Sequence, residues 1–278
     1  MESKELGKTG VKIPMLGMGT WGIGGLSGKQ IGGDVEAVRG LKYGLELGMR
    51  FIDTAEMYGH GHSEEVVAEA VKGRRDEVFI ATKVSAEHLA HDDVLKACEA
   101  SLRRLKTNYI DLYQVHWPNN RVPIPETMKA MERLVAEGKV RHIGVSNFSV
   151  RQTSEAQEAL SKVSLASNQV EYSLLERSIE ADLLPYAQKE LVTIIAYTPV
   201  AKGQFAHGGR GKQWGILDEV ASRYGKTRTQ VALNWLIVQD EVVAIPKAVS
   251  REHIKENLGA TGWALSREDI DLLNRAFA

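Results

Sequence analysis

The sequence contains a single cysteine, so no disulfide can form within the chain. That residue, Cys98, lies among apolar residues at helical spacing, which favours a buried structural thiol in a reducing compartment. No apolar run is long enough to cross a bilayer, and the N-terminus is charged rather than apolar. We therefore expect a soluble cytoplasmic protein without a membrane partner.

An excess of charge of either sign is also missing. The chain has 35 basic and 36 acidic residues, for a net charge of -1. This balance offers no electrostatic basis for binding nucleic acid or an anionic membrane. Repeats, low-complexity tracts and linkers are absent too, so the 278 residues, 43% of them hydrophobic, predict one α/β domain spanning 1–278.

Two motifs resemble ligand sites but lack the context that those sites need. Residues 17–22 spell G-x-G-x-x-G, but the glycine-rich segment 23–28 cannot open the helix that a Rossmann dinucleotide site requires. We expect these glycines to let the first loop run close to a ligand. His60 and His62 have no third ligand at suitable spacing, so no metal site is expected.

Short apolar runs alternate with amphipathic stretches at the spacing of βα units. The expected strands cover 16–19, 51–54, 78–82, 110–115, 142–145, 166–170, 193–196 and 242–245. The expected helices cover 34–47, 63–71, 92–105, 125–138, 150–160, 178–188, 229–238, 250–258 and 265–278. Eight such units predict a (β/α)8 TIM barrel, with an open parallel sheet as the alternative, and residues 4–13 predict a β-hairpin at one end.

Polar side chains stand at the carboxyl ends of three expected strands. Asp53 ends one strand and is followed by Tyr58, Lys83 ends the next, and His116 ends the third. In a barrel these ends meet on one face. A tyrosine with a pKa near 10 needs a neighbouring cation to exchange a proton near neutrality, and Asp53 would keep Lys83 charged for that purpose. His116 would donate a hydrogen bond to a carbonyl oxygen.

These residues lie in motifs that resemble the aldo-keto reductase family. The matching segments are FIDTA at 51–55, YG at 58–59, TK at 82–83, DLY at 111–113, HWP at 116–118, GVSNF at 144–148, NQVEY at 168–172, AYTPV at 196–200, IPK at 245–247 and EN at 256–257. The resemblance implies a barrel without a Rossmann domain that passes hydride between a nicotinamide cofactor and a carbonyl carbon. It implies that Tyr58 is the general acid, that Asp53 and Lys83 tune it, and that His116 orients the substrate.

The resemblance also implies a cofactor site along the barrel mouth. Ser146, Asn147 and Gln169 would bond the carboxamide, and Tyr197 would stack on the nicotinamide ring. The remaining expected cofactor contacts are Gly19, Thr20, Trp21, Asp53, Thr198, Pro199, Val200, Gly203, Lys247, Ala248, Val249, Ser250, His253, Glu256 and Asn257. The segment 198–203 would line the pyrophosphate, and 247–257 would line the adenosine end.

The chain leaves no residues after its last expected helix for a long C-terminal loop over the pocket. We therefore expect an open pocket and a broad range of small carbonyl or alcohol substrates, with contacts from Trp21, Met57, Tyr58, His116 and Trp117. A monomer or small homo-oligomer is expected. Two other classes stay open: a Schiff-base aldolase using Lys83, and a regulatory subunit that binds the cofactor without turnover.

We predict that both NADPH and NADH are used. His253 stands where many family members carry an arginine that grips the 2′-phosphate, and Ala248 stands where many carry serine; an arginine fork binds phosphate best. His253→Arg should shift the preference toward NADPH by about 1.5 to 3 kcal/mol, the scale of a hydrogen bond to a charged group. Dissociation constants for both cofactors on both proteins measure this shift, and an unchanged ratio would mean that His253 does not face the phosphate.

Overall fold

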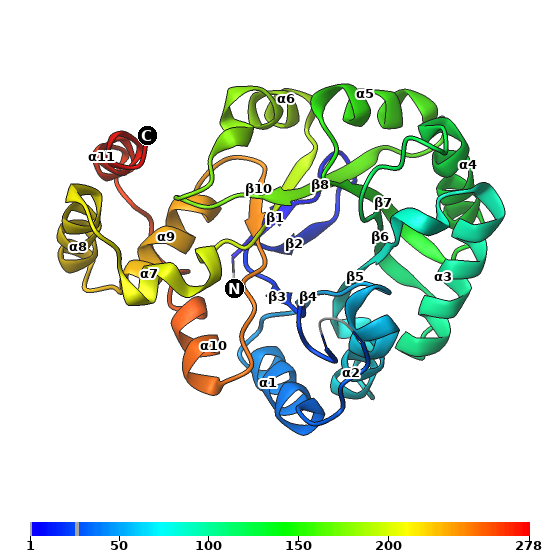
Figure 1. The fold of residues 1–278 in the computed structure, drawn as a ribbon, viewed down its shortest axis with the longest axis horizontal. Helices are drawn as coiled ribbons and strands as arrows, with labels where there is room; N and C mark the ends of the chain where they lie inside the picture. Colours follow the sequence, from blue (N-terminus) through cyan, green and yellow to red (C-terminus); the bar gives the residue numbers. More distant parts are fainter. Residues whose placement is uncertain (1, 26–27) are drawn as a thin grey trace.

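The structure is a computed structural model and describes residues 2–25 and 28–278. An antiparallel hairpin of two strands precedes a parallel sheet of eight (Figure 1). The strands are β1 Ser3–Glu5, β2 Lys12–Pro14, β3 Met18–Gly19, β4 Phe51–Asp53, β5 Phe79–Val84, β6 Ile110–Val115, β7 Val140–Ser146, β8 Leu165–Glu171, β9 Thr193–Tyr197 and β10 Val242–Ala244.

The parallel sheet closes on itself. Strands β3 to β10 pair in chain order, and the first and last meet through parallel bridges from Leu16 to Ala244 and from Gly19 to Lys247. The predicted (β/α)8 barrel and the N-terminal hairpin are therefore confirmed, and the open-sheet alternative is wrong.

Helices surround the barrel (Figure 1). The α-helices are α1 Asp34–Glu46, α2 His62–Ala70, α3 His91–Leu105, α4 Ile124–Ala136, α5 Val150–Ala159, α6 Leu183–Glu190, α7 Gln204–His207, α8 Lys212–Tyr224, α9 Arg228–Ile237, α10 Arg251–Leu258 and α11 Arg267–Ala276. Short 3₁₀ helices are η1 Tyr58–Gly61, η2 Arg75–Glu77, η3 Ala86–His88, η4 Ser178–Ala181 and η5 Ala201–Gly203. Among the described residues, none of these helices combines the length and the apolar character needed to cross a membrane.

Local sequence signals explain several helix boundaries. Helix α5 begins with a capping box, in which the Ser149 side chain accepts from the Gln152 N–H and the Gln152 side chain accepts from the Ser149 N–H. Helix α9 begins with the same arrangement between Thr227 and Gln230. A proline in the first turn of α4 costs no helical hydrogen bond.

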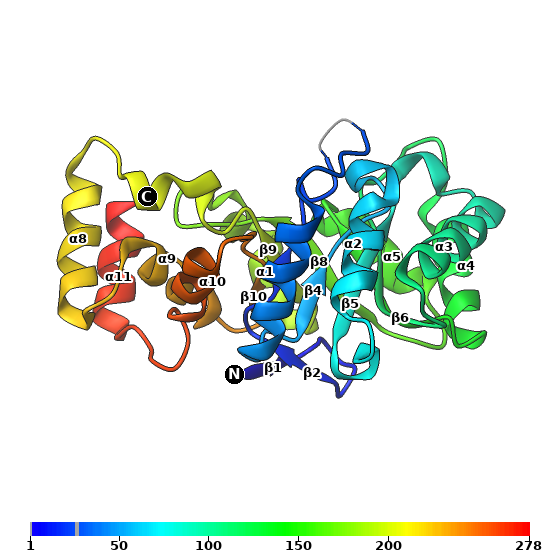
Figure 2. The same ribbon diagram turned by 90° about the horizontal axis from the view of Figure 1, so that it is seen from below.

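The helix predictions were wrong at two places. The helix expected over 178–188 is interrupted at Asp182, whose side chain accepts from the Leu183 N–H and starts α6 as a separate helix. Helices α7 and α8 were not expected, because the segment before α8 is rich in glycine and breaks the helical pattern. Helix α8 lies beside α11, away from the barrel (Figures 1 and 2), where Arg223 and the Tyr224 hydroxyl both bond the buried Asp269.

The glycine motif at 17–22 does not open a helix. Gly22 has a positive φ of 84° and lies in a turn, and α1 begins only at Asp34. The segment 23–28 was expected to be non-helical, and its residues 26–27 lie outside the described part of the chain. Gly19 approaches the residue that follows β10 so closely that a Cβ at this position would clash with the Ile245 carbonyl. Here the glycine allows barrel closure.

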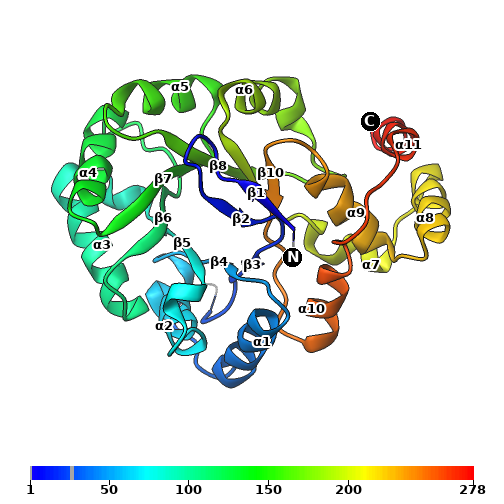
Figure 3. The ribbon, with the colours of Figure 1, turned by 180° about the vertical axis from the view of Figure 1, so that it is seen from behind.

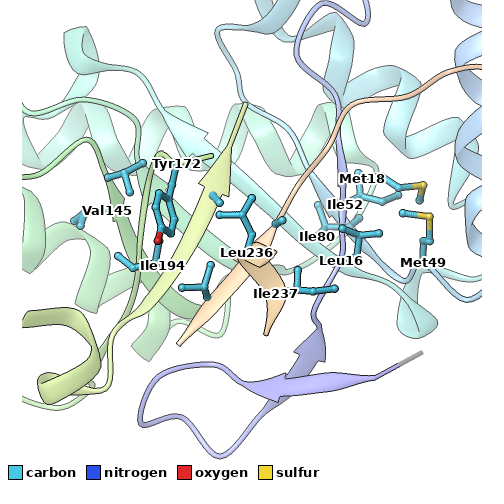
Figure 4. Close-up of a cluster of buried hydrophobic side chains, with 14 of the residues drawn as sticks. Leu16, Met18, Met49, Ile52, Ile80, Val145, Tyr172, Ile194, Leu236 and Ile237 are labelled. Atoms are coloured by element: carbon cyan, nitrogen blue, oxygen red, sulfur yellow. The ribbon is translucent and has the colours of Figure 1, made fainter. Parts of the chain in front are cut away.

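Alternate strand residues face opposite sides of the barrel wall. Ile52, Ile80 and Ile194 point outward into the layer between strands and helices, part of which Figure 4 shows with Leu236 and Ile237 of α9. Cys98 belongs to this outer layer and is fully buried, as predicted, and burial raises its thiol pKa to about 12. Such a thiol is unreactive near neutral pH.

The inward residues form an apolar floor beneath a polar layer. Phe51, Ala81 and Leu112 belong to an inner cluster that also contains Leu6 and Ile13 from the hairpin. Figure 3 shows the hairpin lying across this end of the barrel, and the Gly7 N–H fixes it by donating to the Thr193 hydroxyl at the start of β9. Two residues further along each strand, the inward positions become Asp53, Lys83 and Gln114. The hairpin therefore fills the amino end of the barrel, and polar groups occupy the carboxyl end.

We predict that Ile13→Ala lowers the free energy of unfolding by about 2 to 5 kcal/mol, the cost of removing a large buried aliphatic side chain. Ile13 is fully buried, whereas Val11 in the same hairpin is 36% exposed. Val11→Ala is therefore the matched control and should change stability by less than about 0.5 kcal/mol. Urea unfolding of both variants measures the difference. Equal effects would mean that the hairpin adds nothing to the barrel core.

Candidate active site

The structure brings together the four residues predicted from the strand ends. The Lys83 ammonium lies 2.5 Å from Asp53 Oδ1, 2.9 Å from the Thr54 carbonyl oxygen and 3.4 Å from the Tyr58 hydroxyl. The Tyr58 and His116 rings meet edge to face, with centroids 5.6 Å apart. Lys83 is fully buried, so these polar neighbours take the place of water around its charge.

Asp53 is held from its other side by two amides. Gln169 Nε2 donates to Oδ2 at 2.8 Å and Gln114 Nε2 does so at 3.3 Å. Because a carboxylate only accepts hydrogen bonds, Gln169 Nε2 must face Asp53 and its Oε1 must face away. Gln114 was not predicted from the sequence, although the two-residue period of the strand indicates its inward position between Leu112 and His116.

The acid-base state of Lys83 and Tyr58 follows from burial and from their mutual contact. Burial acts to lower the pKa of Lys83, but the Asp53 carboxylate and Tyr58 raise it above its usual value. Burial raises the pKa of Tyr58, and Lys83 opposes this rise without cancelling it. The expected influence of Lys83 on Tyr58 is present, but the net direction is upward. Tyr58 is thus a protonated phenol near neutral pH, and Lys83 is an ammonium ion, which counts against a Schiff-base role.

His116 is neutral. Burial lowers the pKa of its imidazole to about 3, and the Lys83 charge acts in the same direction. Nδ1 is buried without a hydrogen-bond partner among the described residues. In folded proteins a buried N–H without a partner is rarer than a buried acceptor without one, which favours the tautomer with the proton on Nε2.

The residues expected at the carboxamide form a connected polar group. Ser146 Oγ donates to the Gln169 carbonyl oxygen at 2.8 Å, and Asn147 Nδ2 donates to the His116 carbonyl oxygen and to Ser146 Oγ. The Tyr197 hydroxyl donates to Asn147 Oδ1. Asn147 has a positive φ of 62°, a conformation that asparagine tolerates better than most residues. This group joins β6, β7, β8 and β9 at one level of the barrel.

The residues expected at the rest of the cofactor lie along the next two strand ends. After β9, Thr198, Ala201 and Lys202 have positive φ angles of 52°, 47° and 56°. After β10, Lys247 and His253 are exposed and the Ser250 hydroxyl caps α10 by accepting from the His253 N–H. Asn257 and Ala248 are buried, and Glu256 accepts from the Thr227 hydroxyl.

The residues expected to contact substrate differ sharply in exposure. Trp21, Met57 and Trp117 are 56%, 48% and 47% exposed, which is unusual for side chains so large and apolar. They follow β3, β4 and β6, so all three lie at the carboxyl face with Tyr58. Thr20, expected at the cofactor and not at the substrate, is buried, and its hydroxyl accepts from Ser63.

His62, considered above as a metal ligand, forms hydrogen bonds with two carboxylates. Its Nε2 lies 2.8 Å from Asp34 Oδ2 and its Nδ1 lies 2.6 Å from Glu65 Oε2. Both ring nitrogens are therefore engaged by carboxylates, and the Asp34 contact joins α1 to α2.

Comparison with known proteins identifies the family. The model of the aldo/keto reductase family matches residues 15–277. This chain belongs to the aldo-keto reductase family. It is therefore an oxidoreductase of that family, and methylglyoxal reductase YeaE of Escherichia coli is 38% identical over 96% of this chain and 92% of its own length.

Solved aldo-keto reductases share the whole fold. The thermostable aldo-keto reductase Tm1743, solved with the inhibitor epalrestat, superposes with a TM-score of 0.94 at 44% identity and covers 99% of this chain and 100% of its own. An aldo-keto reductase from Klebsiella pneumoniae, solved in complex with NADPH, gives 0.89 at 38% identity, covering 100% of this chain and 96% of its own.

We predict that the His116 ring does not change its protonation between about pH 5 and about pH 8, because its pKa lies near 3. Imidazole carbon and nitrogen chemical shifts followed by NMR through this range measure it, and His116→Asn identifies the signal by removing it. A sigmoidal shift of that signal between these pH values would contradict a neutral His116.

Proposed function

We propose that this protein is an NAD(P)H-dependent reductase that converts small aldehydes and ketones to alcohols, with Tyr58 as the general acid. One observation carries the proposal: a fully buried lysine ammonium contacts both a carboxylate and a tyrosine hydroxyl, and a neutral histidine ring packs edge to face against the ring of that tyrosine. A protonated phenol and a neighbouring imidazole N–H can both donate hydrogen bonds to the oxygen of a carbonyl substrate.

When bound, the reduced nicotinamide supplies the hydride that adds to the carbonyl carbon. His116 Nε2–H donates a hydrogen bond to the carbonyl oxygen and orients it toward Tyr58. As negative charge develops on that oxygen, the Tyr58 hydroxyl transfers its proton and the alcohol forms. The Lys83 ammonium stabilises the resulting phenolate, and Asp53 keeps Lys83 charged throughout. Solvent then returns a proton to Tyr58.

The residues around the tetrad fit a nicotinamide cofactor. Gln169 Oε1, turned away from Asp53, offers an acceptor to a carboxamide N–H, and Ser146 and Asn147 lie within the same polar group. We assign Tyr197 to the ring face, the loop at Thr198 to Gly203 to the pyrophosphate, and the exposed Lys247 and His253 to the adenosine end. The NADPH complex of the Klebsiella pneumoniae protein supports NADPH as the cofactor, and we propose that NADH is used as well.

The proposed substrates are small carbonyl compounds, and the same residues can oxidise the corresponding alcohols. Methylglyoxal and glyoxal reductases among the relatives support small aldehydes as substrates. The exposed Trp21, Met57 and Trp117 fit an open pocket with little size selection. Reduction needs the Tyr58 phenol and oxidation needs its phenolate, so oxidation should have the higher pH optimum.

We predict that Tyr58→Phe lowers the rate of carbonyl reduction by about 10²-fold or more, the scale for a removed general acid. The cofactor should still bind, because the phenol makes no essential contact with it. Consumption of reduced nicotinamide with a panel of simple aldehydes, followed by absorbance, measures the rate, and fluorescence titration measures cofactor binding.

Tyr186→Phe is the matched control. It removes a tyrosine hydroxyl on α6, outside the barrel, whose bond is to Gln157. Wild-type protein without turnover of any carbonyl would favour the binding-module alternative. Near-wild-type turnover by the Tyr58 variant would refute the role given to this residue.

A further inference from the structure

Glu64, on α2, is a fully buried carboxylate that the proposed chemistry does not use. Its Oε2 lies 2.5 Å from Arg104 Nε of α3, and its Oε1 accepts from the Thr82 hydroxyl at 2.6 Å. Burial raises the pKa of Glu64, while Arg104 and Thr82 oppose that rise. Replacing a buried ion pair by apolar residues of similar volume is often neutral or stabilising. Stability alone therefore does not explain this pair.

Arg104 contacts the chain on both sides of Tyr58. Glu64 follows Tyr58 by six residues, and Glu56 precedes it by two. Arg104 Nη2 lies 3.8 Å from Glu56 Oε2, and Glu56 Oε1 accepts from the Ser85 N–H at 2.7 Å. The segment that carries Tyr58 is thus joined to one guanidinium at its beginning and at its end.

The same contacts lead to the strand that carries Lys83. Successive residues of β5 face opposite sides of the barrel wall: Thr82 bonds Glu64 on the outside, and Lys83 reaches Tyr58 on the inside. Gly61 allows the loop to lie against Arg104, since it has a φ of 87° and a Cβ there would clash with the guanidinium.

We propose that Arg104, acting through Glu64 and Glu56, is a positioning residue that holds Tyr58 within hydrogen-bond reach of Lys83. This inference rests on the proposed function, in which Tyr58 is the proton donor. Arg104 touches neither the substrate nor the reacting atoms. Its effect is to fix the Tyr58 loop against β5.

The test uses three variants of the full chain. Arg104→Met removes the guanidinium and leaves the stem volume. Arg104→Met alone leaves the Glu64 carboxylate buried without its ion-pair partner. Glu64→Gln combined with Arg104→Met removes that charge as well and keeps an acceptor for the Thr82 hydroxyl. The double variant should therefore fold even if the single variant does not. Arg103→Met is the matched control, because Arg103 is the exposed neighbour of Arg104 on α3. For each we measure kcat and KM of aldehyde reduction, the pH profile of alcohol oxidation, and the thermal unfolding midpoint.

We expect both Arg104 variants to lose about 10- to 100-fold in kcat, the scale of a misplaced catalytic group, with KM little changed. The rise of the oxidation rate with pH should move to higher pH, because Lys83 acts to lower the pKa of Tyr58 and a looser contact weakens this effect. Arg103→Met should match wild type in every measurement, and the double variant should keep the wild-type unfolding midpoint.

A folded double variant with wild-type kcat and an unmoved pH profile would overturn the positioning role. So would an equal loss in Arg103→Met. Failure of the proposed function is distinguished by Tyr58→Phe: full activity in that variant removes Tyr58 as the acid, whereas inactive Tyr58→Phe with fully active Arg104 variants refutes positioning alone.

Discussion

The ion pair between Lys83 and Asp53 is the interaction on which the site depends. Removing an ammonium group from water costs several kcal/mol, and breaking a buried pair by deleting one partner leaves an uncompensated charge. The Thr54 carbonyl oxygen, the Tyr58 hydroxyl and the amides on Asp53 complete the neutralisation. The barrel supplies these partners from β4, β5, β6 and β8 at once, which no local segment of the chain could do.

The ion pair also influences the protonation states of the neighbouring titratable groups. It keeps Lys83 charged, and the Lys83 charge helps to keep His116 neutral. Under the proposed chemistry, Tyr58 gives up its proton, and the neighbouring His116 keeps its own and donates a hydrogen bond. A network outside the barrel wall, through Arg104, joins the Tyr58 loop to the strand that carries Lys83.

Much of this architecture could be predicted from the sequence, because each βα unit carries its own period and its own turn residues. The strand ends at Asp53, Lys83 and His116 were readable for that reason, and barrel closure then required them to meet. Helix α8 could not be predicted, since its stability depends on packing against α11, far along the chain. The net pKa direction of Tyr58 also escaped prediction, because it depends on the depth of burial and not on which residues are neighbours. The contacts of Glu64 and Gln114 could not be predicted either, because their partners are distant in the sequence and meet only in the folded barrel.

The hairpin across the amino end of the barrel affects the route by which a proton can reach Tyr58 from solvent. Leu6 and Ile13 of the hairpin belong to the buried apolar cluster that closes the interior beneath the polar layer. Under the proposed chemistry, a proton exchanged with Tyr58 would then pass through the carboxyl face, by which the substrate would also enter. A bound ligand that covers this face would separate the tyrosine from bulk water. Reprotonation of Tyr58 would therefore follow product release, because both take place through the carboxyl face.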